Sequence, residues 1–289
     1  MCGFGNGASI TGIEVVEVDS QKTGRESRLW LQAYQRSKLD ELRHQNFEES
    51  KSVRDVTLVA YTFPKDPADF DFIEFSILHS WKLLGLLRVV IVADRMTPQL
   101  TEFRGKYPAT WVDVQVEPKL QCGNITSMSA DCVQRLYKRF ETPYCLIIQD
   151  DGFPIRDNLG DFLGKWDYIG SPTVRDVPAQ KLVDWFHYSC INGGFSLRSK
   201  RLCSAVARSW KFWGRFMGEG SSRAVEDVYY TQTFCLNPIN LFRFRWPTCR
   251  EARRFAVLDF DGALDVDALE TNPFGVHGAS TARQTLRED

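Results

Sequence analysis

The sequence has no surplus of charge of either sign. Its 289 residues include 36 Lys and Arg against 37 Asp and Glu, so the formal net charge is −1. Domains that bind nucleic acid through bulk charge are strongly basic, because phosphate contacts need Lys and Arg, and this balance excludes that class. It also excludes an acidic disordered tail. Any affinity for a polyanion must therefore come from a local site.

Long apolar runs and paired cysteines are missing as well. No stretch approaches the roughly 20 apolar residues of a membrane helix, and the N-terminal segment has neither the basic start nor the apolar run of a secretory signal. None of the eight cysteines belongs to a Cys-x-x-Cys pair, which argues against a zinc ribbon. We expect reduced cysteines and a cytoplasmic protein.

Segments typical of strands alternate with segments typical of helices in the first half. Apolar and β-branched runs predict strands at 56–63, 88–93, 111–116 and 144–149, with helices at 70–87, 98–106 and 128–140 between them. Such alternation predicts right-handed βαβ units and a mostly parallel sheet. A further helix, over 27–47, is expected to pack on the outside.

The second half has a more mixed pattern. Short strands are predicted at 166–169 and 192–197, helices at 202–217 and 226–236, and irregular structure over the last 50 residues. No internal repeat or low-complexity linker divides the chain. We therefore expect residues 1–54 to form a polar segment with a packing helix, and residues 55–289 to form one α/β domain with an elaborated C-terminal half.

Acidic residues follow two of the predicted strands. Ligands of open α/β sheets bind beyond the carboxyl ends of the strands, where Asp94 and the pair Asp150-Asp151 stand. Adjacent carboxylates repel each other and are costly to bury, and a divalent cation holding a diphosphate would remove that cost. A solvated Asp-Asp-Gly turn explains the pair equally well. Asp94 could contact a base or a ribose.

Two further segments combine small and acidic residues. Gly193 and Gly194, which follow Asn192, would let the backbone approach a ligand closely, although a plain tight turn before a strand is the alternative. Glu226 and Asp227 begin a predicted helix, where the helix dipole favours acids. One of them could instead act as a general base in a pocket.

A histidine and a tryptophan complete the candidates. His277 lies in Phe-Gly-Val-His-Gly and is one of only four histidines. A histidine between small residues is either exposed or a ligand, and it could join an earlier Asp on one cation. Trp185 precedes the glycine pair and could stack on a sugar face, whereas ordinary packing is the simpler explanation.

The order and spacing of these motifs resemble those of a known family. The series is Gln149-Asp150-Asp151-Gly152, then Asn-Gly-Gly-Phe-Ser-Leu-Arg-Ser from residue 192, then Glu-Asp-Val from 226 and Phe-Gly-Val-His-Gly from 274. It resembles a bacterial and fungal family of largely uncharacterised GT-A-type glycosyltransferases over roughly residues 55–280, and implies a GT-A-like fold.

The resemblance also implies a metal site. Asp151 would be the ligand of Mn²⁺ or Mg²⁺ at the position of the Asp-x-Asp motif, with Asp150 near the metal or the ribose. His277 would complete the metal shell. Gln149 stands where the family has its first Asp, so which carboxylate does which task stays open.

A reaction is implied in the same way. Glu226-Asp227-Val228 is similar to the Glu-Asp-Val element of inverting β-galactosyl- and β-N-acetylglucosaminyltransferases, so Asp227, beside Glu226, would be the base. The implied donor is a nucleotide-diphosphate sugar, most simply a UDP-sugar. The implied acceptor is a glycan or a lipid-linked molecule. We therefore expect a hexosyl- or N-acetylhexosaminyltransferase of glycan or polysaccharide synthesis.

Two other functions remain open. A catalytically silent sugar- or nucleotide-binding domain could share the fold, because a fold does not decide activity. A sugar-nucleotidyltransferase would share the sheet and the metal, but such enzymes usually have a glycine-rich basic loop after the first strand. The segment Thr-Phe-Pro-Lys-Asp at 62–66 is not such a loop.

Arginines gather between residues 243 and 254. The five are Arg243, Arg245, Arg250, Arg253 and Arg254. Such a cluster could contact a diphosphate, a phosphorylated acceptor or an anionic membrane surface, so peripheral membrane contact is one expectation. A solvated basic face is the alternative.

Overall fold

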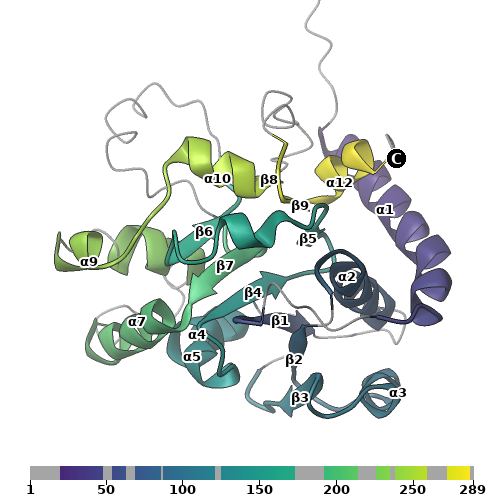
Figure 1. Ribbon diagram of the computed structural model, residues 1–289, viewed down its shortest axis with the longest axis horizontal. Coiled ribbons are helices and arrows are strands. Elements are labelled where there is room, and N and C mark those ends of the chain that lie inside the picture. Colours follow the sequence, from purple (N-terminus) through teal and green to yellow (C-terminus); the bar gives the residue numbers. More distant parts are fainter. Residues whose placement is uncertain are drawn as a thin grey trace, which may run out of the picture.

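The computed structural model describes residues 20–47, 54–62, 69–85, 87–120, 125–172, 192–213, 226–234, 238–258 and 272–286. Within these residues, a six-stranded sheet has the order β3-β2-β1-β4-β7-β6 (Figure 1). Its strands are β1 (Val56–Thr62), β2 (Arg88–Ala93), β3 (Val112–Val116), β4 (Tyr144–Ile148), β6 (Tyr168–Gly170) and β7 (Ser196–Ser199). Strands β1 to β4 pair in parallel, and β7 runs antiparallel to β4 and β6. The mostly parallel α/β fold is confirmed.

Helices connect the parallel strands as the alternation predicts. They are α2 (Asp69–Leu84), α3 (Pro98–Lys106), α4 (Ile125–Gln134) and α5 (Leu136–Arg139). The start of α3 is set locally, because the side chain of Thr97 accepts a hydrogen bond from the N–H of Leu100 and Pro98 occupies the first turn. The predicted helix over 128–140 is two helices that meet at Arg135.

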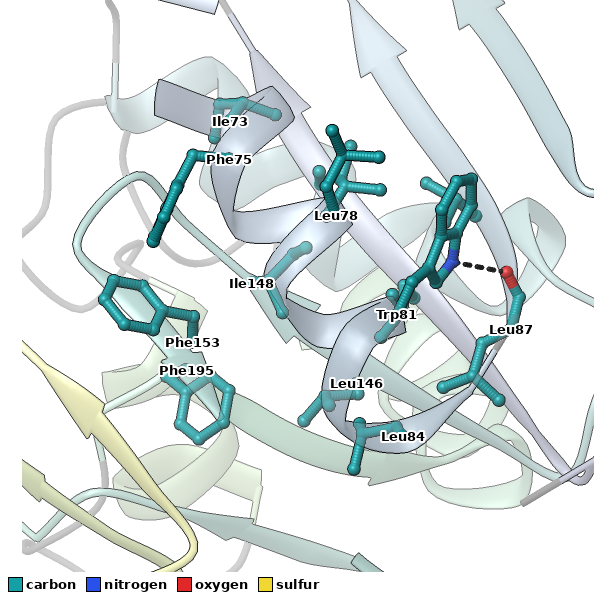
Figure 2. Packing of buried hydrophobic residues seen from close by; sticks show 14 of the residues in the cluster. Ile73, Phe75, Leu78, Trp81, Leu84, Leu87, Leu146, Ile148, Phe153 and Phe195 are labelled. Carbon is teal, nitrogen blue, oxygen red and sulfur yellow. Dashed lines mark hydrogen bonds between the residues drawn. The ribbon is translucent and has the colours of Figure 1, made fainter. Parts of the chain in front are cut away.

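The main core lies between α2 and the sheet. Every residue of β1 is buried, as expected for a central parallel strand. Figure 2 shows Trp81 of α2 donating its Nε1–H to the carbonyl of Leu87 at 2.9 Å. Phe75 of the same helix meets Phe153 edge to face, with ring centroids 5.6 Å apart. Burial of each such ring stabilises the fold by about 1.5–3 kcal/mol.

A second, smaller sheet corrects the expectation of an irregular C-terminal end. Strands β5 (Gly152–Pro154), β9 (Gly275–His277) and β8 (Ala256–Leu258) pair in the order β5-β9-β8. Three-residue strands carry too little period to be recognised in a sequence. The same region holds α9 (Pro238–Arg243), α10 (Cys249–Phe255) and α12 (Ala279–Thr285). This sheet brings residues more than 120 positions apart next to the end of β4.

Other predicted bounds shift in the second half. The strand expected at 192–197 is β7, and the helix expected at 202–217 is α7 (Lys200–Trp213) as far as the structure describes it. The helix expected over 226–236 begins as α8 (Glu226–Val228) and continues as the π-helical turn η5 (Tyr229–Phe234). Turns of this type are frequent at functional sites.

The N-terminal helix α1 (Ser20–Arg43) lies against α2 and α12 (Figure 1). Leu31, Leu39 and Leu42 are buried on its inner face. At its end the guanidinium of Arg43 contacts the carboxylate of Glu74 in α2 at 2.6 Å. Helix α1 is therefore part of the packed structure. None of the described helices is both long and apolar enough to cross a membrane.

Candidate functional site

The Asp150-Asp151 turn directs its two carboxylates to different partners. Gln149 and Gly152 form an isolated bridge that closes the turn, with the Gln149 N–H donating to the Gly152 carbonyl at 2.9 Å. Asp150 lies toward α1, where its Oδ2 is 3.0 Å from Nη2 of Arg28. Asp151 lies toward β9, where its carbonyl accepts the Gly278 N–H at 2.8 Å. The two adjacent acids therefore have different neighbours.

Asp150 is held mainly through its backbone. Gln35 of α1, which is 1% exposed, donates its side-chain N–H to the Asp150 carbonyl at 2.5 Å. Partial burial and the neighbouring Asp151 charge raise the pKa of Asp150 to about 6, although Arg28 opposes the shift and the side chain is still 37% exposed. The sequence predicts Asp150 at the metal or the ribose, whereas the structure places its carboxylate on Arg28. Its role toward a ligand stays a prediction.

His277 faces a cluster of oxygen atoms. The pairing of β5 with β9 sets His277 opposite Gly152. Its Nε2 lies 3.1 Å from Oε1 of Gln149 and 3.7 Å from Oδ1 of Asp151. The second separation is too long for a hydrogen bond. Gln149 Oε1 can therefore accept the Nε2–H of a neutral His277, and with Asp151 Oδ1 nearby the three atoms could instead share a cation.

Because Gly194 has no side chain, Gln149 and His277 can lie directly against its backbone. A Cβ at this position would lie 2.5 Å from Oε1 of Gln149 and 2.5 Å from Nε2 of His277. Only glycine fits there without displacing both side chains. The turn is held by Asn192, whose Oδ1 accepts the Gly194 N–H at 2.8 Å. The close backbone approach predicted for the glycine pair is therefore observed, and what it approaches is the Gln149–His277 pair.

Gly193 approaches a different pair, formed by Arg198 and Glu226. A Cβ on Gly193 would overlap Oε1 of Glu226. The Arg198 guanidinium lies 2.7 Å from that oxygen and also donates to the Gly193 carbonyl at 3.1 Å. Arg198 is fully buried, with its guanidinium carbon 4.9 Å and 4.7 Å from the ring centroids of Tyr168 and Tyr230. Glu226 is thus fixed in a buried ion pair.

Asp227 lies next to that ion pair. Its Oδ1 accepts the Val228 N–H at 2.7 Å, and the Gly193 N–H also contacts it. Burial and the charge of Glu226 raise the pKa of Asp227 to about 6, and these two N–H groups hold the rise in check. A carboxyl with a pKa near 6 can take up a proton near neutral pH, which suits a general base.

The remaining predicted residues are less connected. Asp94 follows β2 with its side chain 11% exposed, and one of its oxygens is buried without a hydrogen bond. Within the described residues, no hydrogen bond or ion pair joins Asp94 to the clusters above. Trp185 lies outside the described residues. Four of the five predicted arginines, Arg243, Arg245, Arg250 and Arg254, are exposed, and the backbone N–H of Arg245 binds Asp167 at 2.9 Å. A contact of these arginines with an anionic partner stays a prediction.

Sequence reasoning missed Arg198 and Gln35. Arg198 lies in strand β7, whose sequence Ser-Leu-Arg-Ser is mostly polar although all four residues are buried, so the sequence gives no signal of its burial. Gln35 gives no signal, because a glutamine on a helix is normally exposed. In the sequence, Gln149 stands out only as a departure from a motif. In the structure, its amide oxygen is the hydrogen-bond partner of His277 Nε2.

The donor set at His277 fits a hard or borderline divalent cation. Asp151 offers a carboxylate, His277 an imidazole nitrogen and Gln149 an amide oxygen, which suit Mn²⁺ or Mg²⁺. Among the described residues, no three His, Cys, Asp or Glu side chains gather in one place. A cation here would therefore need further ligands from a bound molecule.

Comparisons with known proteins give a family and distant structures. The family model that matches residues 116–277 is described as "Protein of unknown function (DUF5672)". A comparison with curated proteins gives no match. One similar solved structure is the mannosyltransferase Ktr4p from S. cerevisiae, with 10% identity, a TM-score of 0.40, and coverage of 70% of this chain and 73% of that one.

Two other structures are similarly distant. The mannosyltransferase PcManGT from Pyrobaculum calidifontis, in complex with GDP-Man and Mn²⁺, has 12% identity and a TM-score of 0.35, over 73% of this chain and 61% of that one. The apo glycosyltransferase GlyE from Streptococcus pneumoniae TIGR4 has 11% identity and a TM-score of 0.47, over 80% of this chain and 54% of that one. At such distances the function must be argued from the site itself.

Proposed function

The chain belongs to the DUF5672 family, and from its site we propose that it is a metal-dependent, inverting glycosyltransferase of the GT-A type. It moves a hexosyl or N-acetylhexosaminyl group from a nucleotide-diphosphate sugar, with a UDP-sugar as the expected donor, to a hydroxyl group. One observation carries the proposal. The Gly193-Gly194 turn has Gln149 and His277 against one glycine and Glu226 against the other, with Asp227 bound to the turn.

Asp151 and His277 would hold the cation, with Gln149 beside them. Their single carboxylate leaves coordination positions for oxygens of a diphosphate. When bound, the cation supplies positive charge against the charge that develops on the departing nucleotide. The chain itself carries no basic surplus, with a formal net charge of −1. A local cation therefore makes a polyanionic donor compatible with a nearly neutral protein.

Asp227 is the proposed base. It accepts the proton of the acceptor hydroxyl as that oxygen attacks the anomeric carbon from the face opposite the leaving group, so the configuration inverts. The half-buried position of Asp227 and its raised pKa of about 6 favour this task. The N–H groups of Val228 and Gly193 orient the carboxylate. The base and the glycine turn are thereby held in one arrangement.

Glu226, predicted alongside Asp227, is proposed here as a positioning residue. Its carboxylate is bound to buried Arg198 at 2.7 Å, so it is poorly placed to exchange protons with a substrate. Arg198 also binds the Gly193 carbonyl. The ion pair thus orients the turn that contacts Asp227, and it keeps a second negative charge beside the base.

The proposal extends to the setting of the reaction. We place it in glycan or polysaccharide synthesis in the cytoplasm, with a glycan or lipid-linked acceptor. Exposed arginines such as Arg250 and Arg254 would serve any peripheral membrane contact. Asp94 is proposed to contact the base or the ribose of the donor, because it stands at a strand end and, within the described residues, one of its oxygens is buried without a hydrogen bond, with only the 3.8 Å ion pair to Arg95.

Replacement of the base provides the decisive experiment. In Asp227→Asn, we expect the hydrolysis of a nucleotide-sugar donor, with water as the acceptor, to fall by about 10²–10⁴-fold. Nucleoside diphosphate with Mn²⁺ should still raise the melting temperature, because the proposed metal ligands are unchanged. A panel of UDP- and GDP-sugars covers the unknown donor. Asp113→Asn is the matched control, since Asp113 lies on edge strand β3 with its side chain 36% exposed.

The same panel separates the alternatives. A parent protein that binds nucleotide with Mn²⁺ but hydrolyses no donor would be a silent binding domain. If Asp227→Asn hydrolyses the donor as fast as the parent protein does, Asp227 is not the catalytic base. Nucleotide binding that persists in excess chelator would remove the metal from the proposal.

A further inference from the structure

A separate cavity of about 340 Å³ lies between the 3₁₀ turn η1 (Asn158–Asp161) and helix α10. Its polar lining includes Asn158, Asp161, Lys165, Glu251 and Arg254. None of the residues assigned above to the metal, the donor or the base lines this cavity. Its volume falls at the small end of the range for ligand sites, about 300–1,000 Å³.

The charges of the lining balance. Lys165 and Arg254 contribute two positive charges, and Asp161 and Glu251 contribute two negative ones. Within the described residues, neither cationic side chain has an ion-pair partner. Both carboxylates are oriented by neighbours, since Asn158 Nδ2 donates to Asp161 at 3.2 Å and the Thr248 N–H donates to Glu251 at 2.7 Å. The cavity therefore offers donors and acceptors together without attracting a net charge.

One acceptor in the lining is unpartnered. The Oδ1 atom of Asn158 is buried and has no hydrogen bond, while its Nδ2 is bound to Asp161. A buried amide oxygen without a donor is costly, and rotation of the Asn158 side chain toward the cavity would let a ligand hydroxyl or a water relieve that cost. Asn272, also in the lining, has a φ of 58°, the left-handed region that few non-glycine residues adopt. Such positions cluster at ligand sites.

An apolar wall completes the cavity. Trp166 is half-buried in it, and the ring of Phe162 closes it toward the core. A ligand that matches this lining has hydroxyl groups that both donate and accept, an apolar C–H face and no net charge. We propose that the cavity is a binding site for a neutral sugar residue, distinct from the proposed transfer site.

A series of packed aromatic rings connects the cavity to the glycine turn of the proposed transfer site. The Phe162 ring packs on Phe255 with centroids 5.2 Å apart, and Phe255 packs on Phe195 at 5.3 Å. Phe195 directly follows Gly194, the glycine at the proposed metal cluster. This proximity assigns to the cavity a sugar unit of the acceptor glycan, remote from the reacting hydroxyl. The assignment to an acceptor rests on the proposed function, whereas sugar binding itself does not.

A direct binding experiment tests the site without any turnover. The whole chain is applied to a printed array of neutral oligosaccharides built from glucose, galactose, mannose, N-acetylglucosamine and rhamnose, with sulfated and phosphorylated glycans beside them. We expect retention of at least one neutral glycan. Asn158→Leu, which removes the free acceptor, and Lys165→Gln, on the cavity's charged side, should each weaken that retention about tenfold. Asp113→Asn, on edge strand β3, should leave it unchanged.

The outcomes distinguish the two proposals. Absence of neutral-glycan retention, with the Mn²⁺-dependent nucleotide shift intact, overturns the sugar site and leaves the proposed function standing. Retention of charged glycans only, lost at high salt, also overturns it. Equal retention by the parent and by a folded Lys165→Gln or Asn158→Leu variant, as judged by melting temperature, places the glycan elsewhere. If the cavity variants reduce glycan retention but the parent protein binds no nucleotide, the sugar site is supported and the proposed glycosyltransferase activity is refuted.

Discussion

Two pairs of adjacent carboxylates flank the glycine turn, and in each pair one member is bound by an arginine. Arg28, the partner of Asp150, has its side chain 58% exposed, and the carboxylate is 37% exposed. Arg198, the partner of Glu226, is 0% exposed and the carboxylate 7%. Exposed pairs contribute about 0–1 kcal/mol, whereas breaking a buried pair costs about 3–5 kcal/mol.

The different burial of the two ion pairs matches the different tasks proposed for the base and for the metal cluster. A base must stay in one orientation, and the buried Arg198–Glu226 pair fixes the backbone next to Asp227. A metal cluster must admit and release a charged ligand, and the exposed Arg28–Asp150 pair is weak enough to rearrange. The second acid of each pair, Asp151 or Asp227, is the one that we assign to chemistry.

The largest expected effect comes from breaking the buried pair. Arg198→Leu leaves Glu226 buried without a counter-charge, so we expect the free energy of unfolding to fall by about 3–5 kcal/mol. Denaturant unfolding measures it. The double change Arg198→Leu with Glu226→Leu should recover much of the loss, because no isolated charge remains. If Arg198→Leu alone lowers the free energy of unfolding by less than about 1 kcal/mol, the buried pair stabilises the fold no more than the exposed one, and the proposed difference between them is wrong.

Changes at the metal cluster should come next. We expect His277→Ala and Asp151→Asn each to weaken Mn²⁺-dependent nucleotide binding by more than about tenfold, since changes to groups behind metal ligands alone cost about 10–100-fold. Asp150→Asn is the matched control and should weaken binding less, because its carboxylate is directed to Arg28. A thermal-shift titration with nucleoside diphosphate and Mn²⁺ gives the affinities. His277→Ala behaving like the parent would refute the metal cluster.

A pH profile sharpens the assignment of the base. Asp227 must be ionised to accept a proton, and its pKa is raised to about 6. The rate of donor hydrolysis should therefore fall about tenfold for each pH unit below about 6. The folded state also holds this proton more tightly than the unfolded chain, so stability from this group is lost as the pH rises from about 4 to about 6. A rate that is flat from pH 5 to 8 would exclude Asp227 as the base.

The smallest effect is expected at the exposed pair. Arg28→Ala should lower the free energy of unfolding by less than about 1 kcal/mol, and by less still at high salt, because solvent screens the pair. Chemical denaturation at two ionic strengths measures both values. A loss comparable to that of Arg198→Leu would show that the Asp150 side is as rigid as the Glu226 side.

The parallel half of the fold could be predicted closely from the sequence. Strand β2 and helix α3 have the bounds that the pattern predicts, Arg88–Ala93 and Pro98–Lys106. Buried parallel strands are continuous apolar runs, and a capping threonine with a following proline marks a helix start. These signals are local, so a single sequence contains them in full.

The second half could be predicted only in part, because its structure depends on distant pairings. Strand β9 is three residues long and exists through its pairing with β5 and β8. The meeting of His277 with Asp151 follows from that pairing, and local pattern carries no trace of it. The buried Arg198 and Gln35 contradict the usual exposure of their residue types. The resemblance of motifs supplied the residues there, and the structure supplied their partners.

Helix α1 bears on where the working unit of this protein begins. The matched family segment starts at residue 116, and the expected domain starts at 55, yet buried Gln35 binds the carbonyl of Asp150. A chain shortened to residue 55 would retain the six sheet strands and lose the donor that orients the acidic turn. The six-stranded sheet therefore begins at β1, whereas the residues that form the candidate site begin earlier, in helix α1. Comparisons of relatives by the matched segment alone would omit a part of the site that lies about eighty residues upstream of it.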